Sequence, residues 1–114
     1  MTQQPDPDTI RHDFRRAVNM TAAELEVWLC TKESRSVGWQ HEGEAESVGH
    51  QSGRRIVEIL RHRQAALTED DLAHMRKTSG YVHRHLTQGG PAEKVETSRW
   101  RYSLMNWGHD PLKK

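Results

Sequence analysis

The sequence predicts an all-α fold, a single compact domain of about five helices, from three observations. Its 114 residues suit one domain, since domains commonly hold about 100–200 residues. Apolar side chains recur at helical spacing in segments bounded by Gly, Pro or Ser/Thr residues. No segment alternates polar and apolar residues convincingly over a strand's length. We place a short disordered lead at residues 1–8 and the helical domain at residues 9–112.

The first helix is expected directly after this polar lead. Asp8 or Thr9 can accept a hydrogen bond from a first-turn amide, as N-cap residues do. Ile10, Phe14 and Val18 then follow at intervals of four, the spacing of one helical face.

The second helix begins at a capping box. Thr21 and Glu24 can each bond the backbone amide of the other, which is a strong helix-start signal. The apolar face then runs to about residues 30–33. Cys30 lies near the end of that face, so we expect it to be a small core residue.

A Gly/Ser-rich loop is predicted between the second and third helices. Residues 34–53 contain four glycines and show neither helical nor strand period. A third helix then spans residues 54–63, and a fourth follows the cap signature at Thr68. Gly89-Gly90-Pro91 ends the fourth helix, and residues 92–107 form the fifth.

Charge is distributed unevenly along the chain. Residues 1–52 hold 5 Lys/Arg and 9 Asp/Glu, a net of −4, whereas residues 53–114 hold 12 and 7, a net of +5. This asymmetry favours a polyanion partner for the second half, although solvated helix faces that differ in charge would give the same pattern.

The fourth helix carries the strongest candidate site. At about 100° per residue, five of its residues share a third of the circumference, away from the apolar stripe. They are Arg76, Lys77, Gly80, His83 and Arg84. Such a face suits DNA phosphates, and a glycine lets a backbone approach closely. The alternative is a solvated face on which Gly80 permits tight helix packing.

Two further segments could contact a nucleic acid. The loop residues Ser47, Gly49, Ser52 and Gly53 lead to Arg54 and Arg55, which suggests an anion site at a helix N-terminus. Those loop residues could equally serve only to start the helix. Arg99 and Arg101, with Tyr102, alternate with Trp100 and Trp107, which we expect to be core anchors.

The sequence gives no positive sign of a metal, cofactor or catalytic site. The histidines lack metal-ligand spacing, and no CxxC, HExxH or nucleophile-elbow motif occurs. We therefore predict no enzyme activity, no metal and no cofactor. One cysteine fits a reducing cytoplasm, and no apolar run is long enough to span a membrane.

Five strings of residues are similar to a known family: 19–29, 46–60, 74–77, 80–86 and 99–111. They resemble a family of small bacterial and fungal proteins of unknown function, whose members are often labelled as DNA-binding in genomes. The resemblance covers about residues 10–112 and supplies no catalytic motif. It implies DNA binding, which would place the protein at the nucleoid.

We therefore predict a DNA-binding module with mainly phosphate contacts, little sequence specificity and room for a homodimer. Two alternatives stay open. One is a protein-interaction or oligomeric stress-accessory module that binds no nucleic acid. The other is a small enzyme or a protein that binds a phosphorylated ligand at the loop before the third helix.

Overall fold

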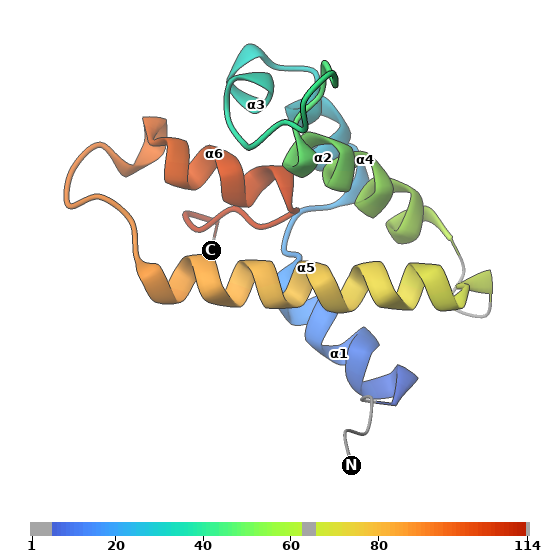
Figure 1. The fold of residues 1–114 in the computed structure, drawn as a ribbon. Helices are drawn as coiled ribbons and strands as arrows, with labels where there is room; N and C mark the ends of the chain where they lie inside the picture. The colour runs from blue at the N-terminus through green and yellow to red at the C-terminus, as the bar shows by residue number, and fades with distance from the viewer. Residues whose placement is uncertain (1–5, 63–65, 114) are drawn as a thin grey trace.

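The computed structural model describes residues 6–62 and 66–113, and within them it is all-helical (Figure 1). This confirms the predicted all-α class. The elements are α1 (Pro7–Ala17), α2 (Ala22–Leu29), α3 (Lys32–Ser36), α4 (Val48–Arg61), α5 (Glu69–Gln88), the short 3-10 helix η2 (Val95–Thr97) and α6 (Arg99–Asn106).

Helix α1 starts earlier than the sequence suggested. Asp6 is its N-cap, and the Asp6 carboxylate accepts a hydrogen bond from the Thr9 amide at 2.8 Å. Pro7 occupies the first turn, where a missing N–H costs nothing. The predicted caps, Asp8 and Thr9, are therefore wrong, and α1 begins inside the expected lead. Residues 1–5 of that lead lie outside the described part.

The two capping boxes form as expected. Glu24 accepts from the Thr21 amide at 2.8 Å, and Thr21 accepts from the Glu24 amide at 3.1 Å. Thr68 and Asp71 make the same exchange at the start of α5. Helix α2 ends at Cys30, which is exposed, so the expectation of a core cysteine is wrong.

The predicted loop at residues 34–53 is wrong at both ends. Thr31 caps the extra helix α3, and Ser47 caps α4, which begins at Val48, six residues before the expected start. Helix α4 contains Gly49 and Gly53, and the absence of a side chain at each lets neighbouring elements pack closely against the helix. A Cβ at Gly53 would lie 2.5 Å from the Asn106 carbonyl oxygen, so only glycine fits at that crossing.

The fifth predicted helix is interrupted. Lys94 adopts a left-handed conformation with φ of 55°, η2 follows, and Ser98 then caps α6 by accepting from the Arg101 amide at 3.1 Å. Helix α5 keeps its predicted course and ends at Gly89, whose φ is 80°.

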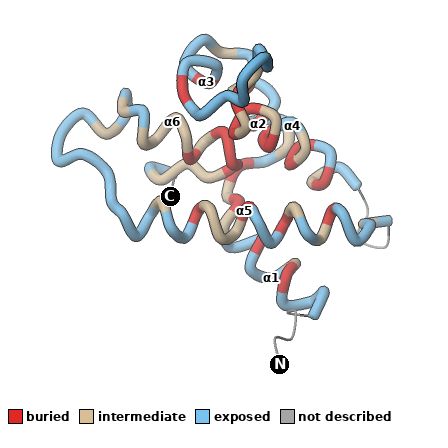
Figure 2. The backbone as a smooth tube through the Cα atoms, in the orientation of Figure 1, coloured by how far each residue is buried: buried red, intermediate tan, exposed pale blue. Residues whose placement is uncertain are grey.

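Helix α5 lies between α1 on one side and α4 and α6 on the other (Figure 1). Figure 2 shows that the buried residues lie where these helices meet. The buried apolar residues are Ile10, Phe14, Val18, Met20, Leu25, Leu29, Val37, Ile56, Val57, Ile59, Met75, Val82, Leu104 and Trp107. The core therefore draws on every long helix, and α5 is left with one side free.

The segments before α2 and after α6 lie against each other. The amides of Asn19 and Met20 both donate to the Gly108 carbonyl, at 3.1 and 3.2 Å. The Asn19 side chain donates to the Asp110 carbonyl and accepts from the Asp110 amide, at 2.9 and 2.8 Å. The chain is thereby closed across about ninety residues.

Candidate nucleic-acid interface

The free side of α5 carries the predicted basic residues. Asp71, Met75, Thr78 and Val82 form its buried side. The four predicted contact side chains of α5 are all exposed. They are Arg76, Lys77, His83 and Arg84. The structure therefore brings the strongest sequence candidate together on one surface, which we call the basic face.

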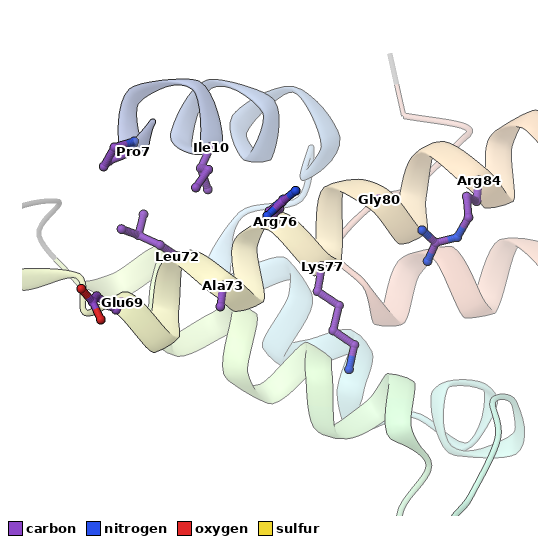
Figure 3. Close-up of a pocket in the computed structure, with 9 residues that line it drawn as sticks. All are labelled: Pro7, Ile10, Glu69, Leu72, Ala73, Arg76, Lys77, Gly80 and Arg84. Carbon is purple, nitrogen blue, oxygen red and sulfur yellow. The ribbon is translucent and has the colours of Figure 1, made fainter. Parts of the chain in front are cut away.

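The residues of the basic face form rows along the helix axis because they recur every seven residues. Arg76 and His83 are seven residues apart, as are Lys77 and Arg84, so each pair forms a row along the axis. The small residues Ala73, Gly80 and Thr87 also recur every seven residues, and at about 100° per residue they fall between the rows. Figure 3 shows Arg76 on the side of α5 that faces α1 and Lys77 extending away from it.

Two surface hollows adjoin the basic face on the side of α1. One has a volume of about 810 Å³ and the other about 640 Å³. Ile10 of α1, with Arg76 and Gly80 of α5, lines both of them. The basic face is thus part of a shallow trough rather than a plain convex cylinder.

Gly80 lies on the floor of that trough. The nearest group to a Cβ placed there would be Nη1 of Arg84, at 3.2 Å. No other helix packs against this glycine, so tight helix packing does not explain it. Its absent side chain instead leaves room for the Arg84 guanidinium (Figure 3).

Internal ion pairs divide the predicted cations into two groups. Arg54 pairs with Glu46 at 2.5 Å, Arg55 with Asp71 at 2.8 Å, and Arg101 with Asp110 at 3.0 Å. Arg54 holds the pKa of the Glu46 carboxyl below its ordinary value. These three arginines are thus engaged by carboxylates of the chain itself.

The remaining predicted contact residues are free of such pairs among the described residues. Within residues 6–62 and 66–113, no carboxylate lies within ion-pair distance of Arg76, Lys77, His83, Arg84 or Arg99. Four of the five lie on the basic face. An external anion can therefore reach them without breaking an internal bond.

Most of the segment predicted as an anion-binding loop is helical. Gly49, Ser52 and Gly53 lie inside α4 and are buried, and a Cβ at Gly49 would lie 3.1 Å from Nε1 of Trp107. The Ser47 hydroxyl already accepts from the His50 amide at 3.1 Å. Placing this segment in an open loop was wrong, because glycine here allows close helix contact rather than loop flexibility.

The aromatic residues of α6 and of its C-cap, Trp107, lie mainly inward. Trp107 is 4% exposed and stacks on Tyr81 with ring centroids 4.3 Å apart. Trp100 donates from its indole nitrogen to the His85 carbonyl at 3.0 Å. Tyr102 contacts Trp28, with ring centroids 5.4 Å apart. Trp100 and Trp107 are thus the anchors that the sequence suggested.

Sequence reasoning missed Trp39. Its side chain is 66% exposed, and it forms an edge-on contact with His41 at 4.3 Å between ring centroids. It lines a hollow of about 300 Å³ that also contains Lys77 and Arg84. A tryptophan in a glycine-rich stretch without apolar neighbours at helical spacing was the available signal.

His74 and His50 make hydrogen-bond contacts that the sequence did not predict. The Ser52 hydroxyl lies 2.8 Å from Nε2 of His74, but Ser52 is buried and lines none of the hollows described here. Nε2 of His50 donates to the Leu29 carbonyl at 2.7 Å. Burial lowers the pKa of His74, and nearby Arg55 and Lys77 lower it further. These contacts link α4 to α5 and to the end of α2.

Neither a metal cluster nor a membrane-spanning helix is found among the residues described. No group of three His, Cys, Asp or Glu side chains there is placed to hold an ion. No described helix combines the length and the apolar character that crossing a bilayer requires.

The fold and the basic face define a small all-helical protein with one open cationic side. A family model described as "Protein of unknown function (DUF3140)" matches residues 13–105, and the chain belongs to this family. No curated protein and no solved structure matches the chain.

Proposed function

We propose that this protein binds DNA through the basic face of α5, mainly by phosphate contacts. The observation that carries the proposal is the pair of rows, Arg76 with His83 and Lys77 with Arg84, which brings two arginines and a lysine together on the side of α5 that faces solvent. Neither row has an ion-pair partner among the residues that the structure describes. Cations that meet phosphates release condensed counterions, and this release supplies affinity without sequence information.

The geometry of the face suits a strand of phosphates. The two residues of each row are about 10 Å apart along the helix axis, from the rise of about 1.5 Å per residue. The small side chains between the rows let a backbone come close, and Gly80 is the closest point. A sugar-phosphate backbone along this seam would have cations on both sides.

Little sequence preference is expected. No Asn or Gln occurs between residues 73 and 87, so the face lacks the side chains that read adenine. The first turn of α5 is acidic, with Glu69 and Asp70 exposed, and would repel phosphates. Contact is therefore confined to the part of α5 that follows residue 72. Such a role would place the protein in the cytoplasm, at the nucleoid.

Fluorescence anisotropy with a labelled random-sequence duplex at several salt concentrations tests the proposal. Affinity should fall steeply with salt, and Arg76→Ala with Arg84→Ala should weaken it and make the logarithmic salt slope shallower by about two. The matched control is Lys32→Ala with Arg35→Ala on α3, which removes the same charge from exposed positions. Absence of binding at low salt, or equal losses in the two double variants, would overturn the proposal.

A further inference from the structure

The hollow lined by Trp39 opens on the other side of the basic face from the two hollows beside α1. It lies where the loop after α3 meets α4, α5 and α6, and its volume is about 300 Å³. This is at the small end of ligand pockets and suits one aromatic ring rather than a long chain. Its lining includes Trp39, Lys77, Tyr81, Arg84, Ser103 and Trp107.

Trp39 is held at this hollow although it is not buried. The Trp39 carbonyl accepts from the Val48 amide at 2.7 Å, which ties the loop to the first residue of α4. Gly38 reaches φ of 96°, and a Cβ there would meet the Ser47 hydroxyl oxygen at 3.0 Å. A tryptophan gains much of its stabilising effect from burial, and two-thirds of this one faces solvent. The backbone at Trp39 is therefore held in place, and the indole, which contacts His41 edge-on, remains largely open to a ligand.

The hollow combines an aromatic surface with positive charge. Tyr81 and Trp107 stack with ring planes 16° apart and give it an aromatic floor. Lys77 and Arg84 supply two cations that pair with no carboxylate in the described residues. Both cations also belong to the basic face, so the hollow and the proposed phosphate track share an edge.

We infer that this hollow takes one unpaired nucleotide, with its base stacked on Trp39 and its phosphate between Lys77 and Arg84. Base stacking on an exposed aromatic ring, beside cations that follow the backbone, is how proteins hold single strands without reading sequence. For a nucleotide within a strand, the inference rests on the proposed function, since the basic face then holds the neighbouring phosphates. A free mononucleotide offers the same base and phosphate, and the test separates the two sources.

The test compares a labelled oligothymidine strand with a duplex of the same length. Trp39→Ala should weaken single-strand binding about tenfold and leave duplex binding unchanged, because a paired base cannot reach the indole. Trp39→Phe should retain most of the affinity. Val27→Ala is the control, since Val27 is also an exposed apolar residue, at 70%, and does not line the hollow. Single-strand affinity that is equal in Trp39→Ala and the control would overturn the inference.

A third arm uses free AMP and the tryptophan fluorescence of the protein. Quenching that disappears in Trp39→Phe, without binding of any strand, would overturn the proposed function and support the hollow as a free-nucleotide site. Salt-dependent duplex binding with neither a Trp39 effect on the strand nor quenching by AMP would overturn the inference alone. A protein that binds no duplex, strand or AMP would overturn both.

Discussion

The indole nitrogen of Trp28 donates a hydrogen bond of 2.7 Å to the side-chain oxygen of Asn106, 78 residues further along the chain. The Ser34 hydroxyl donates to the same oxygen at 2.5 Å, and the Asn106 amide donates to the Ser34 carbonyl at 3.0 Å. One buried amide thereby joins α2, α3 and α6. In the described part of the chain, every buried side-chain polar atom has a partner.

Replacing Asn106 with alanine should lower the free energy of unfolding by about 3 kcal/mol, because it leaves buried donors of Trp28 and Ser34 unsatisfied. Urea denaturation followed by circular dichroism measures this. Ser34→Ala should cost about 1–2 kcal/mol. The control is Ser36→Ala, an exposed serine of the same helix, α3. A similar loss in Ser34→Ala and Ser36→Ala would contradict the network.

Two helical glycines should respond to alanine in opposite directions. Gly80→Ala should stabilise the protein by about 0.5–1 kcal/mol, since the only close neighbour of the new methyl is the flexible end of Arg84. Gly53→Ala should destabilise by about 2 kcal/mol or more, because the new methyl meets the Asn106 backbone. Melting temperatures of the two variants check this. The same Gly80→Ala protein should bind duplex DNA more weakly, since the seam becomes less open.

Alanine at Arg101 and alanine at Arg99 should differ in their effect on the stability of the fold. Arg101 donates two hydrogen bonds to the Asp110 carboxylate, at 3.1 and 3.0 Å. Burial opposes ionisation of Asp110, but these bonds hold its pKa below the ordinary value. Arg101→Ala should therefore cost about 1–2 kcal/mol of stability. Arg99→Ala, its exposed neighbour, should leave the melting temperature unchanged; equal losses would contradict this assignment.

Stability should decrease as the pH falls below about 6.5. Burial lowers the pKa of both His74 and His85, and Arg55 adds to the effect at His74. The unfolded chain therefore binds protons more readily than the folded one in this range, and protonation favours unfolding. Urea unfolding between pH 5 and pH 8 should show the decrease. His74→Gln should flatten it, with exposed His12→Gln as the control.

The thiol of Cys30 should react in the folded protein. Cys30 caps the end of α2 and is exposed. Ellman's reagent should therefore titrate one thiol per chain without denaturant, at a rate close to that of the unfolded chain. A thiol that reacts only after unfolding would contradict the placement of this residue at the surface.

Local chemistry explains which elements the sequence could predict. The boxes at Thr21 and Thr68 are short-range hydrogen-bond patterns, so both helix starts follow from a few neighbouring residues. The cap of α4 at Ser47 is equally local. The continuation of the helix through Gly49 and Gly53 is not, because glycine normally disfavours helix and the close contacts of these glycines with distant residues, such as Asn106 and Trp107, explain them. Tertiary contact overrode local propensity there.

The features of the candidate site also differ in whether local sequence could predict them. Helical period placed Arg76, Lys77, His83 and Arg84 on one exposed face. It could not reveal that Arg54, Arg55 and Arg101 are paired internally, since their partners depend on how helices and loops pack. Trp39 was missed for a related reason: exposure of a loop residue is decided by the surrounding fold.

The closure of the chain by Gly108 has a consequence for biosynthesis. The residues that complete the core, Leu104 and Trp107, and the carbonyl that receives the Asn19 and Met20 amides, are all made after α5. Contacts of such long sequence separation form late. On the ribosome, α1 can pack on α5, and α2 on α4, before α6 emerges. The apolar surface that Leu104 and Trp107 cover stays exposed until they leave the exit tunnel, and that interval is when this chain is most open to aggregation and to chaperones.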